Sequence, residues 1–533
     1  MSRQHGRFSN SLRSQPFTVL MKFPVVAPIP TCIASRRQFF HQASRGAVAA
    51  WAVPALVQRV GGTARAAASG SISVDRNDDP LGMSATKLAG LIRSRRLSVV
   101  EVVDLYLRRI EAVNPRLRAV VTICAERARA EARAADAAVV SGQPLPALHG
   151  VPMTISDVFD TAAVVSTAGT AGRGGFVPAK DATVVARLRA AGAILLGKTN
   201  TTEFGSGGRD TVNPLFGRTR NPYADNLPCG GPAGGAAVNV AAGGAAFDLG
   251  SGRETSLRCA ALANGLAGLR PTFGRVPRTG HVAHIGGALD FLLEVGPLAR
   301  RVEDLELLLP VLAGADPGDP MTFPVPLPPT AEVKLKGLRI ALCPYVSDEE
   351  NRALPEAAEL VRRCAKLFTD LGCAVVEDMP PKQTEMREIA RDFLRATGPG
   401  IFRRMCERHG TPLTGGASGD EMSSPDFTRT LDELDALKSA QLTWFEDYDL
   451  LLYPGLSPVA PPTGSETGSD DFVPDAFSLN GWPAGVVRVG TSSISPRLPL
   501  GVQVIAHPWR EDRLLTALAH LEARHGGWQK PAI

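Results

Sequence analysis

Two glycine-rich stretches contain the residues whose types and spacing could do chemistry. Residues 229–237 read CGGPAGGAA, and the glycine pairs would allow the backbone to approach a ligand closely, although the stretch carries no hydroxyl group. Residues 249–258 read LGSGRETSLR and place Ser256 on a loop after a predicted strand. A serine hydroxyl is a candidate nucleophile for acyl transfer, but it needs a neighbouring base to take its proton.

Three side chains are candidates for that base. Glu254 would act as a base only if it were desolvated and turned inward, which its place on the same loop as Ser256 does not ensure. His281 and His284 lie in RTGHVAHIGG, and either could assist the serine. We expect both histidines to be ordinary hydrogen-bonded loop residues.

Cysteines offer a second type of nucleophile. The chain has eight, and none forms a C-x-x-C pair, so the sequence predicts no zinc or redox motif and no cofactor. Cys229 and Cys259 flank the two glycine-rich stretches; we expect Cys259 to pack in the first turn of a helix, and Cys229 has no evident activator. A dyad of Cys229 with His281 is an alternative. Cys364 and Cys373 could form a disulfide in an exported protein, although buried free thiols are the expected state.

Alternating strands and helices would position these loops. The expected strands are VPMTIS, AILLGKTN, AAFDLGS, LRIALCPYV, CAVVED, DLLLYPG and LPLGVQVIAHP. The expected helices include ATVVARLRAAG, RVEDLELLLPVLAG and residues 354–371 and 511–525. This alternation predicts an α/β fold with a large, mostly parallel, twisted mixed sheet that is covered by helices on both faces.

Helix ends carry their own signals. Ser98 and Glu101 form a predicted capping box inside a helical region that runs from about residue 84 to 141. The dipeptide Asn114-Pro115 is expected to end that helix, because the residue before a proline is biased away from helical backbone angles. Asp181 is expected to cap a later helix.

Charge is distributed unevenly along the chain. The 533 residues are 44% hydrophobic and 21% charged, an ordinary composition for a soluble globular protein. The formal net charge of +5 falls to −4 when the nine basic residues among the first 68 are set aside, so nothing favours a nucleic-acid partner. In that basic segment, Arg36-Arg37 is a twin-arginine pattern, followed by a weakly apolar run at 46–57 and three alanines at 66–68. The run is too short to be a permanent membrane anchor.

These signals predict an export signal that leads to the periplasm of a bacterium, with a basic disordered tail as the alternative. Met21 is an alternative start, nearer to the motif. The chain then divides into a twin-arginine signal region at residues 1–68, a linker at 69–83 and a single domain at 84–530. Within that domain we expect a partly separate segment at about 335–430, of which residues 408–430, rich in Gly, Ser and Thr, form a loop.

Several longer stretches carry a family resemblance. They are GVPMTISDVFD, KDATVVARLRAAGAILLGKTNTTEFG, NPLFGRTRNPY, GLAGLRPTFGRVPRTG, VGPLARRVEDLELLLPVLAG and LPLGVQVIAHP. Residues from about 80 to 525 thereby resemble the amidase signature family, serine hydrolases that cleave amides. The resemblance implies a large, mostly parallel sheet surrounded by helices, no cofactor, and a site near the segment that holds His281 and His284. Dimers are common in the family, so the resemblance leaves a homodimer open.

The resemblance also implies a catalytic relay, and this chain departs from it. The family uses a serine nucleophile, a second serine held by a cis peptide bond, and a lysine base that takes the proton through the second serine. Ser256 stands at the nucleophile position, but Ser156 replaces the lysine and keeps its proton across the physiological range. Pro232 replaces the second serine. Because a cis bond costs about 0.5–1 kcal/mol before proline but about 2.5–4 kcal/mol elsewhere, we predict a cis Gly231–Pro232 bond.

The approach to Ser256 departs from the family pattern as well. Where the family has two glycines, this chain has Glu254 and Thr255, preceded by Arg253, and Gly252 replaces an aspartate. Thr255 is β-branched and would resist a positive φ. Glu254 puts a carboxylate near the place where an oxyanion should form, and its charge would oppose that oxyanion.

Three functions are consistent with this sequence. The main interpretation is an exported amidase-family protein whose amidase activity is absent or severely impaired and which binds a small amide or carboxylic acid. The second is a working amide or ester hydrolase with a rebuilt site that uses Ser256. The third is a scaffold whose former pocket mediates protein contacts.

Overall fold

A computed structural model describes residues 79–206, 208–253, 256–284, 292–344, 355–413, 422–455, 476–493 and 497–533. All of these belong to one compact unit, Val74–Ile533. The predicted twin-arginine region lies outside the described residues.

The centre of this unit is a large mixed β-sheet, with eleven strands in the part of the chain that the structure describes. In spatial order the strands are β1 (Val120–Ile123), β3 (Ile194–Thr199), β2 (Pro152–Ser156), β6 (Phe247–Arg253), β8 (Leu293–Ala299), β7 (Ala267–Arg270), β12 (Ala484–Thr491), β13 (Pro499–Ala506), β11 (Leu450–Pro454), β9 (Arg339–Leu342) and β10 (Ala374–Glu377). Parallel pairing joins β3, β2 and β6 and, separately, β11, β9 and β10; the remaining pairs are antiparallel. A separate hairpin pairs β4 (Val212–Asn213) with β5 (Gly217–Arg218).

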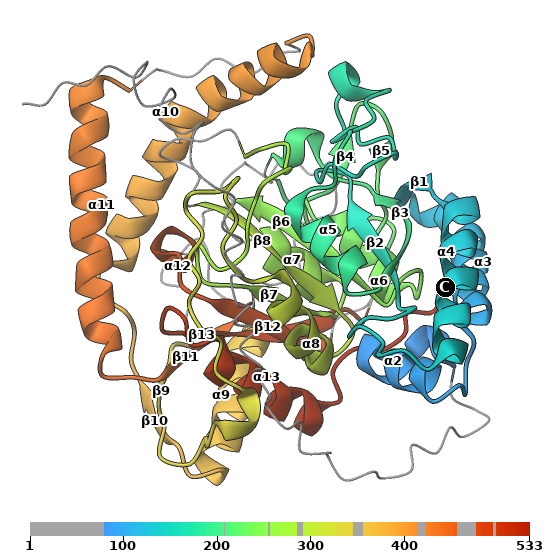
Figure 1. The fold of residues 1–533 in the computed structure, drawn as a ribbon. Coiled ribbons are helices and arrows are strands. Elements are labelled where there is room, and N and C mark those ends of the chain that lie inside the picture. Colours follow the sequence, from blue (N-terminus) through green and yellow to red (C-terminus); the bar gives the residue numbers. More distant parts are fainter. Residues whose placement is uncertain are drawn as a thin grey trace, which may run out of the picture. The chain divides into compact units, whose positions relative to one another are not determined.

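Helices flank the sheet (Figure 1). They are α2 (Ala85–Arg93), α3 (Val99–Leu117), α4 (Ala125–Ser141), α5 (Thr183–Ala190), α6 (Gly234–Ala241), α7 (Ser256–Ala263), α8 (Val302–Leu312), α9 (Pro355–Asp370), α10 (Gln383–His409), α11 (Ser424–Phe445), α12 (Ala476–Asn480) and α13 (Glu511–His525). Short 3-10 turns are η1 (Pro80–Gly82), η2 (Ala171–Arg173), η3 (Glu203–Gly205) and η5 (Thr330–Glu332). Helices α3 and α4 pack on each other beside β3, and the long helices α10 and α11 pack on each other as well (Figure 1). The predicted fold, a large mixed sheet flanked by helices, is confirmed.

The amino-terminal helical region is more divided than the sequence indicates. The capping box at the start of α3 is confirmed, since Ser98 Oγ accepts from the backbone N–H of Glu101 and the Glu101 carboxylate accepts from that of Ser98. The predicted end at Pro115 is wrong by one turn, because the proline lies in the last turn and the helix ends at Leu117. The Asn114 side chain then accepts from the backbone amides of the following residues, and this turn leads into β1, a strand inside the region predicted to be helical.

Two further local predictions are wrong. Asp181 does not cap α5: its carboxylate accepts from the backbone N–H of Ala162 and pairs with Arg189 at 3.0 Å. The predicted loop at 408–430 is helical from residue 424 onward, because Ser423 caps α11 by accepting from the N–H of Asp426. The predicted strands, the helix at α8 and the closing helix α13 are confirmed.

The segment that begins near residue 335 extends the main sheet. It adds β9, α9 and β10, and β9 pairs in parallel with both β10 and β11. The two cysteines of this segment are free thiols with separate partners: Cys364 Sγ lies 3.8 Å from His525 Nε2, and Cys373 Sγ lies 3.1 Å from the carbonyl of Leu335. The expected free thiols are therefore confirmed for this pair.

Candidate active site

Ser256 is the first residue of α7 and is buried at the end of β6. Gly252, the residue before the last in β6, lies directly against it: a Cβ added to Gly252 would stand 2.4 Å from Ser256 Cβ and 2.7 Å from Ser256 Oγ. The same point lies 3.0 Å from Cδ of Pro232. No side chain fits at position 252, because the pyrrolidine ring of Pro232 and the hydroxyl of Ser256 both lie within about 3 Å of its Cβ position.

The loop that carries Pro232 is shaped by close backbone contacts. The Gly231–Pro232 bond is cis, as predicted. A Cβ on Gly230 would stand 2.5 Å from the Cα of Ala260 in α7, and a Cβ on Gly231 would stand 2.5 Å from the carbonyl oxygen of Asp210. The glycines therefore let this loop pass between α7 and the chain at residue 210, which is the close approach that the sequence predicts for them.

Ser156 lies on the same face of the sheet as Ser256. Side chains alternate between the two faces along a strand. In the neighbouring strands β2 and β6, Thr154 Oγ1 donates to Asp248 at 2.6 Å, so these two residues share a face. Ser156 follows Thr154 by two residues and Gly252 follows Asp248 by four, so both belong to that face. Ser156 is buried at the end of β2, where the resemblance places a lysine.

His281 lies on the opposite face. Its Nε2 is 2.7 Å from Oγ of Ser251, which alternates with Gly252 along β6 and therefore points away from Ser256. The ring Nδ1 accepts from the backbone N–H of Ala283, so Nε2 carries the proton and donates it to Ser251. His281 is thus a hydrogen-bonded loop residue, as expected, and not a base for Ser256. His284 follows in the same turn, with its N–H on the carbonyl of His281 at 3.0 Å.

Cys229 is buried, and the groups around its thiol make it unreactive. Its Sγ lies 3.4 Å from a carboxylate oxygen of Asp210 and 3.6 Å from the carbonyl of Thr219. Burial and the nearby Asp210 charge raise the pKa of the thiol far above its ordinary value. A dyad of Cys229 with His281 is therefore wrong, since the thiol stays protonated and its contacts lie on other groups.

The structure describes only one of the three predicted residues just before Ser256, namely Arg253. The backbone of Arg253 closes β6 and pairs with Leu293 of β8. Glu254 and Thr255 lie outside the described residues. Cys259 lies in the first turn of α7, as expected.

Lys198 was not among the predicted site residues, yet it is the one lysine that is fully buried in the described part of the chain. Its Nζ donates to the carbonyl of Phe159 at 2.5 Å, to Thr161 Oγ1 at 2.9 Å and to Ser166 Oγ at 3.1 Å. Burial lowers the pKa of this ammonium, and Asp157 at 3.6 Å opposes that shift. Lys198 pairs with Ile155, whose side chain faces away from Ser156, so Lys198 does not lie where the resemblance places a lysine.

A buried carboxyl group that was not predicted lies beneath the site. Asp248 Oδ2 accepts from Thr154 Oγ1 at 2.6 Å and from Thr199 Oγ1 at 3.1 Å, and Asn239 of α6 donates to Thr154 at 3.0 Å. Burial raises the pKa of Asp248 to about 7. An aspartate inside the otherwise apolar strand FDLG is the signal that could have identified it.

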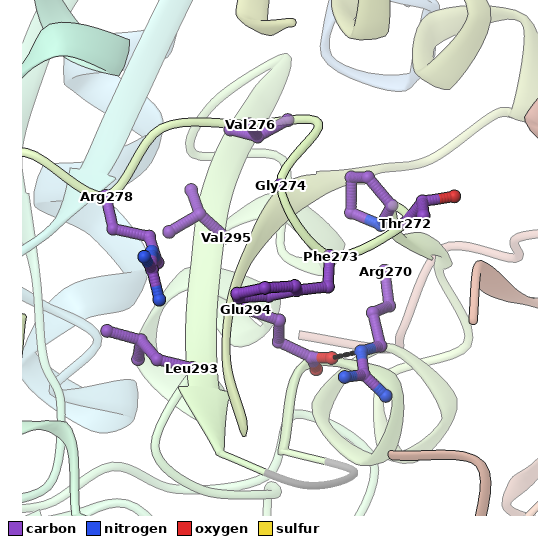
Figure 2. A pocket seen from close by; sticks show the side chains of 10 residues that line it. Arg270, Thr272, Phe273, Gly274, Val276, Arg278, Leu293, Glu294 and Val295 are labelled. Atoms are coloured by element: carbon purple, nitrogen blue, oxygen red, sulfur yellow. Dashed lines mark ion pairs between the residues drawn. The ribbon is translucent and has the colours of Figure 1, made fainter. Parts of the chain in front are cut away.

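A small pocket lies at the start of β8, where Glu294 points to the face of Ser256 and the neighbouring Leu293 and Val295 point to the opposite face. Glu294 pairs with Gly252 across β6 and β8, and paired residues point to the same face. Arg270 lies 2.5 Å from Glu294, and Figure 2 shows the two side chains directed toward one another. Arg278 approaches the ring of Phe273, with its guanidinium carbon 5.2 Å from the ring centroid. The lining residues are Arg270, Pro271, Thr272, Phe273, Gly274, Val276, Arg278, Leu293, Glu294 and Val295 (Figure 2).

Comparison with known proteins decides the family. The family model described as Amidase matches residues 101–433. The chain belongs to the amidase family. This amidase-family chain is 34% identical over 478 residues to indoleacetamide hydrolase of Bradyrhizobium diazoefficiens, covering 83% of the chain and 86% of that relative. It is 34% identical over 465 residues to the glutamyl-tRNA(Gln) amidotransferase A-subunit of a Roseiflexus species, covering 79% of the chain and 91% of the relative.

Solved structures of amidase relatives have the same fold. The chain matches 6-aminohexanoate cyclic dimer hydrolase complexed with substrate with a TM-score of 0.72 at 28% identity, covering 85% of this chain and 99% of that one. It matches native peptide amidase from Stenotrophomonas maltophilia with a TM-score of 0.70 at 27% identity, covering 84% and 98%. The resemblance stated from the sequence motifs is therefore confirmed.

The described residues contain neither a group of metal-ligating side chains nor a helix that could span a membrane. In the described ranges, no three His, Cys, Asp or Glu side chains are grouped so that they could hold a metal ion. None of the helices in those ranges combines the length and the hydropathy that crossing a bilayer requires.

Proposed function

We propose that this chain is an exported amidase-family protein that binds a small amide or carboxylic acid and whose amide-hydrolysing activity is absent or severely impaired. The observation that carries the proposal is that the ring of Pro232 and the hydroxyl of Ser256 both lie within about 3 Å of one point, the Cβ position of Gly252. A relay through this position needs a hydroxyl, and a pyrrolidine ring can neither accept nor donate a proton.

The lysine position supports the same proposal. Ser156 shares the face of Ser256 and is buried there, but its hydroxyl cannot hold the proton that leaves the nucleophile. The groups of a catalytic triad act as a unit, so the loss of two of them is expected to lower turnover by a factor of about 10⁴ or more.

Restoring the relay tests this proposal. The variant Ser156→Lys/Pro232→Ser/Glu254→Gly/Thr255→Gly is expected to hydrolyse simple carboxamides at least about 100-fold faster than the natural chain, because a base, a relay and a flexible approach return together. Ser156→Lys and Pro232→Ser alone are the matched controls and should each gain little. If the fourfold variant folds, binds carboxamides and gains nothing over the controls, the account of the loss is wrong.

A working hydrolase with a rebuilt site is the second candidate. The retained hydroxyl of Ser256 at the amino end of α7 favours it, because the helix end offers backbone N–H groups that an oxyanion can use. A fluorophosphonate probe that labels the natural chain rapidly, and does not label Ser256→Ala, would support this candidate against the impaired one.

The export step rests on the twin-arginine pattern at Arg36-Arg37. Fractionation of bacteria that produce the full chain is expected to place it in the periplasm. Arg36→Lys/Arg37→Lys should retain the protein in the cytoplasm, since it keeps the charge and removes the motif. Equal fractionation of the two chains would refute export by this route.

A further inference from the structure

The two ends of the large sheet are built differently. Strand β1 forms one end, and its pairing with β3 contains a register shift between Val120 and Thr122. Such an irregularity hinders the addition of a further strand. Strand β10 forms the other end (Figure 1), and its pairing with β9 is regular from Ala374 to Glu377. In the part of the chain that the structure describes, no strand other than β9 pairs with β10, so this end is a regular open edge.

The outer side of β10 presents backbone groups to a further strand. Ala374 and Asp378 donate their N–H groups to carbonyl oxygens on the β9 side, at 2.8 and 3.1 Å. Because the backbone groups of alternate residues point to opposite sides of a strand, those of Val375 and Glu377 point away from β9. A row of outward N–H and C=O groups is a template for pairing with another chain.

We propose that β10 pairs in antiparallel fashion with β10 of a second copy of this chain, so that two copies form one continuous sheet about a two-fold axis. Residues of the Val375 and Glu377 set would exchange N–H and C=O groups across the axis, as hydrogen-bonded antiparallel pairs do. A two-fold pairing closes on itself, whereas β10 against β1 would be a head-to-tail contact that continues into a fibre. The proposal is independent of the function proposed for Ser256.

Charge at the two ends of β10 favours the antiparallel second copy. Lys336 packs on Gly372, just before the strand, and Glu377 and Asp378 lie at its other end. Antiparallel pairing places the basic end of one copy against the acidic end of the other, and symmetry makes this contact twice. Parallel pairing would place like charges side by side. Glu377 lies 3.6 Å from Arg362 of its own chain and keeps 52% of its side chain exposed, so it is accessible to a second cation.

Apolar side chains beside the edge extend the contact. Val376 and Met379 are each 44% exposed, and Leu442 of α11 is 40% exposed. The end of α11 is tied to this edge, because Trp444 Nε1 donates to the Asp378 carboxylate at 2.8 Å. Val376 alternates with Asp378 and points to the same face. Two short strands bury too little surface for a stable dimer by themselves, so this apolar flank supplies the additional area that the proposed contact needs.

Mass and hydrogen exchange of the full chain test the proposal. Analytical ultracentrifugation from about 0.1 to 100 µM is expected to show a monomer that becomes a dimer as the concentration rises. Hydrogen exchange of the peptide that covers residues 373–379 should slow as the dimer forms, because the outward amides become bonded. A monomer throughout that range, or a dimer in which exchange of this peptide stays unchanged, would overturn the proposal.

Charge variants test the orientation of the two strands. Glu377→Lys is expected to weaken dimerisation by about tenfold or more, because it sets two lysines against each other at both ends of the strand pair. Lys336→Glu/Glu377→Lys should recover most of that loss, since it restores opposite charges across the axis while position 377 still faces Arg362 in its own chain. Glu111→Lys makes the same change on the exposed side of α3 and is the control, with no effect expected.

A backbone variant tests the edge itself. Val375→Pro removes one outward N–H and leaves the N–H groups that face β9, a substitution that edge strands tolerate. It is expected to be monomeric across the same concentration range, with thermal unfolding as the check that it is folded. A folded Val375→Pro chain that dimerises like the natural one would overturn the assignment of the edge. If this variant does not fold, the charge variants decide: dimerisation that is equal in Glu377→Lys and in the natural chain would overturn it as well.

Discussion

Pro232 and Ser256 both lie against Gly252, a residue that has no side chain. The Cδ of the proline and the Oγ of the serine lie 3.0 and 2.7 Å from the point where a Cβ on Gly252 would stand. In the proposed function, position 232 lies near the nucleophile position but carries a pyrrolidine ring, where the family resemblance implies a hydroxyl group that moves protons.

Asp248→Asn is expected to alter the pH dependence of stability. Burial raises the pKa of Asp248 from 3.8 to about 7, so the folded chain holds a proton that the unfolded chain releases near pH 4. Stability from this group is therefore complete below pH 4 and is lost as the pH rises toward 7. Relative to the natural chain, Asp248→Asn should gain up to about 4 kcal/mol in free energy of unfolding between pH 4 and pH 7.

Denaturant titrations at several pH values measure that gain. Asp435→Asn removes a carboxylate from the exposed side of α11 and is the control for a simple change of charge. A difference between Asp248→Asn and the natural chain that stays constant from pH 4 to pH 8 would show that Asp248 has the same pKa in the folded and the unfolded chain, which would contradict this prediction.

Lys198→Met is expected to destabilise the fold by about 3–5 kcal/mol, because it leaves Asp157 buried without its cation. Lys198→Met/Asp157→Asn should recover part of that loss, since both charges are then absent. Thermal and denaturant unfolding measure both variants. If the double variant is no more stable than the single one, the ammonium acts through its bonds to Phe159, Thr161 and Ser166 rather than through the ion pair.

Cys229 is expected to resist alkylation in the native protein. The thiol is buried, and burial with the adjacent Asp210 raises its pKa far above neutrality, so almost no thiolate is present at pH 8. Iodoacetamide followed by peptide mass spectrometry should leave Cys229 unmodified until denaturant is added. Modification of Cys229 in the native chain at the rate of an exposed thiol would restore it as a candidate nucleophile.

Much of the fold could be predicted from the sequence because its signals are local. Apolar runs such as AILLGKTN and DLLLYPG form strands, and the capping box at Ser98 is present as expected. The predictions at Pro115 and Asp181 were wrong. The last turn of a helix tolerates a proline, and the Asp181 carboxylate accepts from the N–H of Ala162 and pairs with Arg189. The strand β1 was missed because it is short and is defined by its partner β3.

The site was only partly predictable. Positions 156, 232 and 256 follow from motifs, and the structure places all three on one face. The sequence does not show to which face of the sheet each side chain points. The faces decide that His281 lies on the side of Ser251 and that Glu294 lies on the side of Ser256. Register between strands that are far apart in the chain carries that information. The burial of Asp248 and Lys198 is likewise a property of packing and not of local pattern.

In the proposed function, Ser256 lacks the groups that would remove its proton. The most direct measurement is steady-state hydrolysis of a panel of small carboxamides by the mature chain, with Ser256→Ala as the blank. The account predicts no turnover above that blank. A kcat of about 1 s⁻¹ or more, within the ordinary range for enzymes and abolished in Ser256→Ala, would contradict it.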